Sequence, residues 1–388
     1  MTMAGEPWSG PAAEPNGDIV VEEISRNKFD RLKEILRSSR SVDAYVRSPL
    51  YFAFTGRKRL LYLHSKDFDL IACTHPNDDS TLLLFIPFVY DERSFRSCIN
   101  AIVRNLQNSQ QPELFEIFRL FDSVHIARVP KSLTGLEEPE GYSIVNGCQI
   151  QREKKLDWIF PSYDVLLSRS VDPVGHRLAV YRNKLNKYRG RGVTAVPFAE
   201  VPEKERVWAM RSIAERWAEN KLEGGRNGSN LPFSGAELIE PYEYLAALTK
   251  NPVFSVDGIF LKRGSEYIAF RLWENSGDYA HTVSSFAALL ATYEPGCSEY
   301  LHYEAARRLL ACGYREMCIG GSESAGLDSF KQKFDPIRPH KLFTLKLDIY
   351  AIANLHPMIR GYSEGSSVVA AWTNAQLARE CGKGAMVS

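Results

Sequence analysis

The sequence predicts an α/β protein with mixed sheets (α+β character), organised as two domains. Its 388 residues exceed what one compact core usually holds. The composition, 44% hydrophobic and 24% charged, is that of an ordinary globular protein. Short apolar runs typical of strands alternate with longer segments of helical periodicity, and the same order of elements occurs twice. We therefore expect two similar units in tandem.

The first unit is expected over 19–158. Helices are predicted over 26–38 and 91–106, because their apolar residues recur on one face. Strand-like runs lie at 59–64, 69–73, 81–88, 123–129 and 142–150. Residues 1–18 are rich in Pro and Gly and lack the basic and apolar regions of a signal peptide, so we expect a disordered leader.

The second unit is expected over 159–350, and 351–388 is expected to be a loosely helical extension. Helices are predicted at 175–188, at 202–222, around "YEYLAALT" and at 298–312. Strands are predicted at 192–198, in the three runs "FSVDGIFLKR", "EYIAFRLWEN" and "DYAHTVSSF", and at 314–319 and 341–348. The three central runs are joined by short "GS" and "SGD" turns, which predicts an antiparallel meander.

Several classes of protein are disfavoured by the sequence. No run approaches 18 apolar residues, so no transmembrane helix is expected. The seven cysteines are scattered without a CxxC pair, which favours reduced thiols in a cytoplasmic protein. Neither the cysteines nor the eight histidines have the spacing of metal ligands, so we expect no metal.

The segment 177–191 is basic. It carries six Lys and Arg and no Asp or Glu, whereas the remaining 42 Lys and Arg face 47 Asp and Glu, a net charge of −5. Helical phasing divides it into a buried stripe, formed by Leu178, Tyr181, Leu185 and Tyr188, and a polar face. With no acid at i±4, that face is expected to stay uncompensated and to suit phosphates. A solvated face balanced by acids from elsewhere in the fold is the alternative.

Three stretches resemble a known family: "DWIFPSYDVLLSRSVDPVGHRLAVYRNKLNKY" (157–188), "VDGIFLKRGSEYIAFRLWE" (256–274) and "GYREMCIGGSESAGLDSFKQKFDP" (313–336). Together they are similar to the tandem GNAT-fold aminoacyltransferase module of phosphatidylglycerol lysyltransferases and, more distantly, to FemAB-type peptidyltransferases. The resemblance covers about 45–350. It implies two GNAT-like (acyl-CoA N-acyltransferase-like) domains. One departure is that family members often carry an acid where this chain has Ser284 and Ser285.

The resemblance also implies a position for an acyl-CoA loop of the pattern Arg/Gln-x-x-Gly-x-Gly/Ala before the helix at 298–312. Here the position holds Tyr293, Gly296 and Ser298, and Pro295 removes an amide donor. The exact match at Arg379, Gly382 and Gly384 has no helix after it, and we treat it as coincidental. This degraded loop favours aminoacyl-tRNA over CoA as donor, with no other cofactor.

Acyl transfer requires a base, donors to the oxyanion and protonation of the leaving group. The candidate catalytic residues are Lys331, Glu323, His281 and Ser285. A short helix expected over 327–334 turns Lys331 inward beside Leu327 and Phe334, although its stem could simply cover the aromatic pair. Glu323 could instead cap the next helix, and His281 could be structural. Tyr300, Lys333 and Arg271 are expected to bind substrate.

The expected tRNA-binding residues are Arg177, Arg182, Lys184, Lys187, Arg189 and Arg191. The leading hypothesis is a cytoplasmic aminoacyltransferase that uses charged tRNA, with a small amine or hydroxyl compound as acceptor and no DNA partner. One alternative is an N-acyltransferase using acyl-CoA or a carrier-bound thioester. The other is a non-catalytic RNA-binding or scaffold protein built on a GNAT pair.

Overall fold

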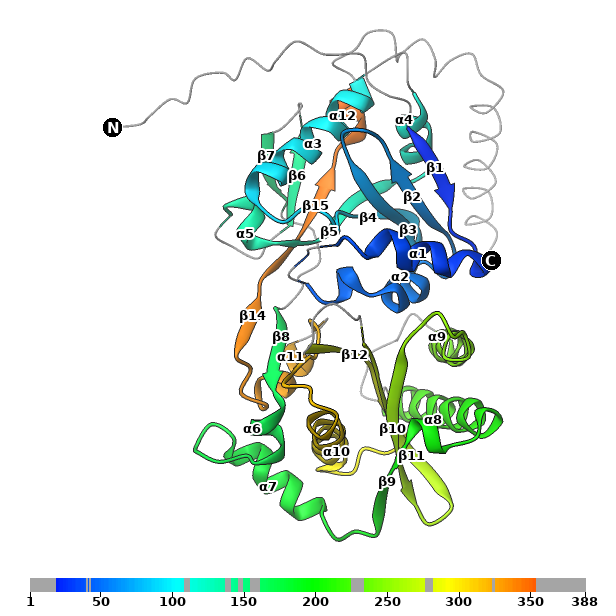
Figure 1. Ribbon diagram of the computed structural model, residues 1–388, viewed down its shortest axis with the longest axis vertical. Coiled ribbons are helices and arrows are strands. Elements are labelled where there is room, and N and C mark those ends of the chain that lie inside the picture. Colours follow the sequence, from blue (N-terminus) through cyan, green and yellow to red (C-terminus); the bar gives the residue numbers. More distant parts are fainter. Residues whose placement is uncertain are drawn as a thin grey trace, which may run out of the picture.

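The computed structural model contains two mixed sheets, one above the other in Figure 1. The structure describes residues 19–39, 41, 43–107, 112–136, 141–145, 149–153, 161–224, 234–275, 282–322 and 325–353. No helix among these residues combines the length and apolarity needed to cross a bilayer.

The first sheet has eight strands in the order β1-β2-β3-β4-β5-β15-β6-β7. Their bounds are Val20–Glu23, Leu60–His64, Asp69–His75, Asp78–Phe85, Ser123–Pro130, Leu342–Leu347, Gly141–Val145 and Gln149–Glu153. The helices of this half are α1 (Phe29–Leu36), α2 (Pro49–Thr55), α3 (Glu92–Gln107), α4 (Glu113–Phe118), α5 (Lys131–Thr134) and α12 (Ile349–Ala353). The predicted run 142–150 is a hairpin of two strands, β6 and β7.

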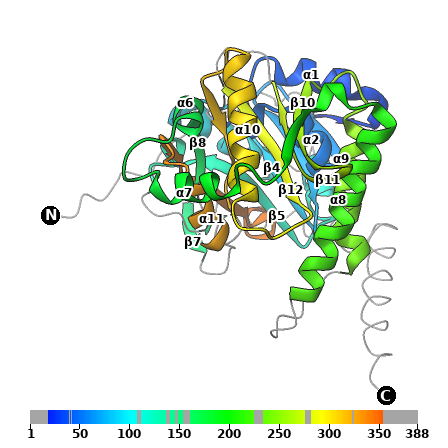
Figure 2. The ribbon, with the colours of Figure 1, turned by 90° about the horizontal axis from the view of Figure 1, so that it is seen from below.

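The second sheet has seven strands in the order β14-β8-β13-β12-β11-β10-β9. Their bounds are Arg338–His340, Ser162–Leu166, Glu316–Cys318, Thr282–Leu290, Glu266–Glu274, Val256–Arg263 and Val193–Pro197. The helices are α6 (Leu167–Val171), α7 (Ala179–Tyr188), α8 (Glu203–Gly224), α9 (Gly235–Leu248), α10 (Cys297–Ala311) and α11 (Ala325–Gln332). In Figure 2, α10 crosses one face of this sheet near α6, α7 and α11, while α8 and α9 lie together to one side.

The two halves repeat one topology. In each, three antiparallel strands are followed by a helix and by a strand parallel to the third: β2-β3-β4, α3 and β5 in the first half, and β10-β11-β12, α10 and β13 in the second. The predicted α/β class with two tandem GNAT-like units is therefore confirmed. The expected stripes are also buried, because each helix covers a sheet: Phe95, Ile99, Ile102 and Leu106 in α3, and Tyr181, Leu185 and Tyr188 in α7.

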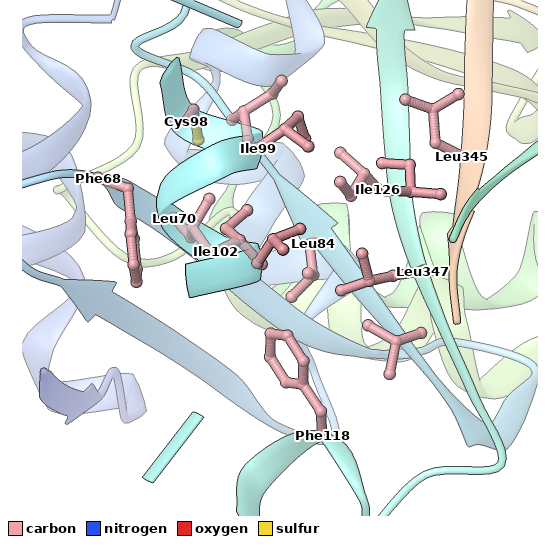
Figure 3. Packing of buried hydrophobic residues seen from close by; sticks show 14 of the residues in the cluster. Phe68, Leu70, Leu84, Cys98, Ile99, Ile102, Phe118, Ile126, Leu345 and Leu347 are labelled. Carbon is pink, nitrogen blue, oxygen red and sulfur yellow. The ribbon is translucent and has the colours of Figure 1, made fainter. Parts of the chain in front are cut away.

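The last strand does not follow the sequence order of the domains. Although β15 falls within the predicted second domain, 159–350, it pairs with β5 and β6 of the first sheet. Figure 3 shows its residues Leu345 and Leu347 in the same cluster as Ile102 of α3 and Ile126 of β5. The chain therefore returns to the first half after β14, and β15 completes that core.

Another apolar cluster contains residues of both halves. Phe29 and Phe52, from α1 and α2, belong to the same buried cluster as Met210 of α8, Leu245 of α9 and Phe270 of β11. Burial of apolar surface is the main favourable term in domain association. The two units therefore share a core.

We expect Leu345→Ala to lower the free energy of unfolding by about 2–5 kcal/mol, the usual cost of such a cavity. Leu345 is 0% exposed in the core of the first half, even though it belongs to the end of the chain. Leu310→Ala, at a side chain 38% exposed on α10, is the control and should change stability by about 0.5 kcal/mol or less. Urea unfolding followed by circular dichroism measures both. Equal effects of the two variants would contradict the placement of β15.

Candidate active site

The candidate site lies where β12 and β13 separate. The two strands pair in parallel as far as Ser284 and Cys318. Beyond this point β12 continues to Leu290, whereas the amide of Ile319 donates to Tyr163 O of β8. Opposite β11, the register shifts so that Phe286 has no partner in the ladder. A bulge of this kind exposes backbone groups and is frequent beside active sites.

Ser285 and Arg271 meet at this separation. Arg271 Nε donates to Ser285 Oγ at 2.9 Å, and Arg271 Nη1 lies 2.9 Å from His302 Nδ1. Because a guanidinium only donates, His302 Nδ1 must be the acceptor, so the imidazole is neutral and carries its proton on Nε2. That nitrogen lies 2.9 Å from Ser170 Oγ, which donates to Leu166 O. Burial, followed by the Arg271 charge, lowers the pKa of His302 well below its ordinary value.

A segment of the first half closes the site from the other side. Tyr45 donates its hydroxyl proton to Ser285 O at 2.5 Å, and its ring lies beside Gly320, where a Cβ would come within 2.7 Å of the Tyr45 hydroxyl. Glycine at 320, with a φ of 71°, is thus required by space as well as by conformation. The site therefore contains residues from both units.

Lys331 extends from α11 toward Gly320 and Gly321, which follow β13, and donates to Gly321 O. It is half-buried, so the expected inward orientation agrees with this contact, while its catalytic role stays a prediction. The apolar face of α11 is only partly buried: Phe334, just beyond the helix, is 2% exposed but Leu327 is 37% exposed. Glu323 and His281, both predicted to be catalytic, lie outside the described residues.

Lys333 and Tyr300 lie near the start of α10, in surroundings different from those of Ser285. Lys333 Nζ is 3.8 Å from Glu299 Oε1, and burial followed by the Lys184 charge lowers its pKa. Tyr300 donates to Val193 O at 3.4 Å and packs against Tyr188 and Tyr303. Neither residue forms a hydrogen bond or ion pair with Ser285 or Arg271, so of the three predicted substrate-binding residues only Arg271 contacts Ser285.

Acidic residues balance part of the positive charge of the basic segment 177–191, which its sequence did not predict. Arg177, Lys184 and Arg191 lie 3.7, 3.4 and 3.5 Å from Asp335, Glu299 and Glu294 respectively. These acids come from other elements, which the absence of acids at i±4 could not reveal. The expectation of a wholly uncompensated face was therefore wrong, and acids from elsewhere in the fold balance half of the six charges.

Two of the other three cations, Arg182 and Arg189, line a surface hollow. Arg182 Nη1 donates to Pro173 O at 2.7 Å and Gly175 O at 3.1 Å, and Arg189 stacks over Tyr303. Lys187 is exposed. The hollow has a volume of about 440 Å³ and is lined by 171–175, Arg182, Asn186 and Arg189.

The start of α10 is covered by α7. Gly296 has a φ of 96°, and a Cβ there would lie 2.6 Å from Lys184 O. Glu299, in the first turn of α10, is 1% exposed, and its Oε1 makes no hydrogen bond within the described part of the chain. The degraded acyl-CoA loop thus lies at a helix start that α7 covers and that carries a buried carboxylate.

The sequence did not predict four residues that contact or adjoin the candidate residues: His302, Ser170, Tyr45 and Glu299. Their only sequence signal was a polar residue at a position expected to be buried, as with His302 in a helix that covers the sheet. Cys318 also lies here, but burial raises the pKa of its thiol to about 12, so it is not a nucleophile at neutral pH. No cluster of three or more metal-ligating side chains occurs among the described residues.

The fold is shared with solved structures. A conserved protein of unknown function from Bacteroides thetaiotaomicron has a TM-score of 0.56 and 14% identity, covering 83% of this chain and 97% of its own. L-PGS from Bacillus licheniformis has a TM-score of 0.52 and 15% identity, covering 86% and 98%. A tandem GNAT protein from the clavulanic acid biosynthesis pathway also matches, at a TM-score of 0.45 and 8% identity over 83% and 96%. The resemblance predicted from the sequence is thus confirmed for the fold.

Neither a protein-family model nor a curated protein matches the sequence. At identities of 14% and 15%, the structural likeness shows the tandem GNAT-like architecture and no more.

A buried carboxyl at the junction of the two halves predicts a pH dependence of stability. Glu274 of β11 is 2% exposed and accepts from Ser48 Oγ and the Leu50 amide, at the start of α2. Burial raises the pKa of Glu274 to about 7, against the smaller opposing effect of Ser48. Because the folded pKa exceeds the unfolded one, the stabilisation is complete below the unfolded pKa of 4.5 and is lost as pH rises through 7.

We expect the wild-type free energy of unfolding to fall between pH 5 and 8 by up to about 3 kcal/mol more than that of Glu274→Gln. Urea titrations at each pH measure the difference. Glu266→Gln, at an exposed position of the same strand, is the matched control and should keep the wild-type slope. An unchanged slope in Glu274→Gln would show that this carboxyl does not titrate with folding.

Proposed function

We propose that this protein is an aminoacyltransferase that moves an aminoacyl group from charged tRNA to a small-molecule or peptide-like amine or hydroxyl acceptor. The product is an amide or an ester. The broad class, acyl transfer, is supported by the tandem GNAT-like fold shared with L-PGS from Bacillus licheniformis. The choice of donor is supported by the start of α10.

The covered start of α10 is the observation that carries the proposal. In a helix that binds pyrophosphate, the first amides point into open space and favour negative charge. Here Gly296 packs against the backbone of α7, and Pro295 has no amide proton. The carboxylates Glu294 and Glu299 lie before and within the first turn. Both acids are ion-paired, Glu294 with Arg191 and Glu299 with Lys184, so the space taken by α7 and the missing amide are what disfavour the pyrophosphate of CoA.

Three cations of the segment 182–189 support an RNA donor. Arg182 and Arg189 line one hollow together with Asp172, and Lys187 is exposed on the same helix as Arg182. None of the three charges is paired with a described carboxylate within 4 Å. Lys and Arg that contact phosphates supply affinity that does not depend on sequence. Only three of the six predicted tRNA-binding residues have no described carboxylate within 4 Å. We therefore assign the main electrostatic contact with tRNA to Arg182, Lys187 and Arg189.

The chemistry is the attack of the acceptor on the ester carbonyl. The acceptor loses a proton, the carbonyl oxygen gains negative charge, and the ribose hydroxyl of the tRNA leaves with a proton. Ser285 Oγ accepts from Arg271, which leaves its own proton to stabilise the oxyanion. Lys331, held at Gly321, is the proposed second donor, and Glu323 or His281 the proposed base.

The direct test is transfer from radiolabelled aminoacyl-tRNA to a panel of amines and hydroxyl compounds. We expect loss of the ester and appearance of labelled product, both abolished by RNase pretreatment and reduced at least tenfold by Lys331→Ala. Lys204→Ala, at an exposed position of α8, is the control. Transfer that requires acyl-CoA or a carrier-bound thioester and survives RNase would replace this proposal. Binding of RNA without turnover of any donor would favour a non-catalytic role.

The α7 surface has a separate test. We expect the triple charge reversal of Arg182, Lys187 and Arg189 to Glu to weaken tRNA binding at least tenfold at 50 mM salt. The difference should shrink as salt rises, because counterion release supplies the affinity. The control reverses Arg96, Arg211 and Lys58, which lie on other exposed elements. Filter binding or fluorescence anisotropy over a salt series measures both, and equal losses in the two triple variants would show a non-specific effect.

A further inference from the structure

Arg271 is a buried cation without an anion. It lies on β11, in the middle of the second sheet, with 7% of its surface exposed. Its contacts are Ser285 Oγ and His302 Nδ1, both at 2.9 Å. His302 must be neutral to accept this bond, so both partners are uncharged. Among the residues that the structure describes, no carboxylate forms an ion pair with Arg271.

A half-buried arginine of the first sheet shows how a guanidinium is held when a carboxylate is present. Arg128 of β5 donates from Nε and Nη2 to the two carboxylate oxygens of Asp43, and it packs on Tyr45 and Tyr51. Burial lowers the pKa of Arg128, but the charge and hydrogen bonds of Asp43, together with Tyr51 and Tyr45, raise it above its ordinary value. Burial without a carboxylate instead lowers the pKa of Arg271 to about 10. Below that pH the guanidinium keeps its charge, and no carboxylate among the described residues compensates it.

A buried unpaired cation is expensive, and a hydrogen-bonding role alone does not account for it. A guanidinium has five N–H donors, and the two contacts use only two of them. The remaining donors have no acceptor among the described residues. Two neutral acceptors could be served by an uncharged amide side chain at lower cost. The charge and the unused donors both indicate that an anionic ligand completes the site.

We propose that Arg271 binds a carboxylate of the substrate, and that the acyl acceptor is therefore a compound carrying both an amine and a carboxylate. A carboxylate matches the planar fork of a guanidinium in two parallel hydrogen bonds. It is also small enough for a site at which Arg271 is only 7% exposed. Ser285, bonded to Arg271, places this anion beside the predicted acyl position.

His302 is the positioning residue of this arrangement. Its ring stacks on Phe334 at a centroid distance of 3.8 Å, and Ser170 holds its other nitrogen. The imidazole is thus fixed as an acceptor that orients Nη1 of Arg271. The identification of the ligand as an acyl acceptor rests on the proposed function, whereas the carboxylate preference of Arg271 does not.

The first experiment needs no acyl donor. The full chain, labelled with ¹⁵N in arginine, is titrated with glycine and with glycinamide at constant ionic strength and pH 7.5, and the Arg271 Nε–H resonance is followed. We expect glycine to shift this resonance to saturation and glycinamide to bind at least tenfold more weakly. Arg271→Met, uniformly labelled with ¹⁵N, should lose the preference, which is then measured through backbone resonances of residues 284–290. Arg308→Met, at an ion-paired position of α10, should keep it.

Arg271→Lys keeps the positive charge but loses the planar pair of donors, so it should retain part of the preference for glycine over glycinamide. This variant tests the proposal if Arg271→Met does not fold. Equal binding of glycine and glycinamide to the wild-type chain, or an unchanged preference in a folded Arg271→Met, would overturn the proposal.

The second experiment locates the carboxylate. Transfer is compared for amine acceptors with and without a carboxylate, and for aminoacyl-tRNAs with acidic and neutral side chains. We expect Arg271→Met to lose at least tenfold in discrimination between acceptors and nothing between donors. Loss of discrimination between donors instead would place the carboxylate on the acyl group and overturn the acceptor assignment. Carboxylate binding without any transfer from tRNA would count against the proposed function alone.

Discussion

The rest of the structure depends on the shared core between the two sheets. Phe29 and Phe52 from the first half and Met210 and Phe270 from the second are buried in one cluster. This packing brings Tyr45 against the turn at Gly320 and Ser285 O, and it brings the start of α2 against Glu274. The candidate site is therefore bounded by both units, although its chemistry-bearing side chains belong mainly to the second.

Strand β15 strengthens the same constraint through the backbone. After β14 has paired with β8 in the second sheet, β15 continues into the first sheet between β5 and β6. Separation of the two units would therefore cost a strand pairing as well as apolar burial. A site built across such a junction can hold its residues in fixed geometry, as electrostatic stabilisation of an oxyanion requires.

The helix α7 has two roles that are separated by its faces. Its buried stripe, Tyr181, Leu185 and Tyr188, packs toward α10 and closes the position at which a GNAT-type helix start would meet a pyrophosphate. On its outer side Lys187 and Arg189 are exposed, and Arg189 lines a hollow. The polyanionic donor that we propose would therefore meet this outer side and not the core.

The sequence by itself determined the elements that follow from local periodicity. The helix 92–107, the stripe of α7 and the meander β10-β11-β12 each depend on the spacing of apolar residues and turns, which neighbouring residues largely decide. The Gly-Leu-x-x-Phe-Lys segment likewise predicted α11 and the orientation of Lys331. These features made both the fold class and a part of the candidate site predictable.

Only the tertiary structure decided which distant residues meet. Three features join residues whose spacing in the sequence carries no periodic signal. They are the pairing of β15 with the first sheet, the contact between Arg271 and His302, and the acids that balance Arg177, Lys184 and Arg191. Burial decides whether a charge such as Arg271 is solvated, paired or left for a ligand, and burial is a property of the packed chain. The sequence could therefore name Arg271 as a candidate, but only the fold showed that no described carboxylate pairs with its charge.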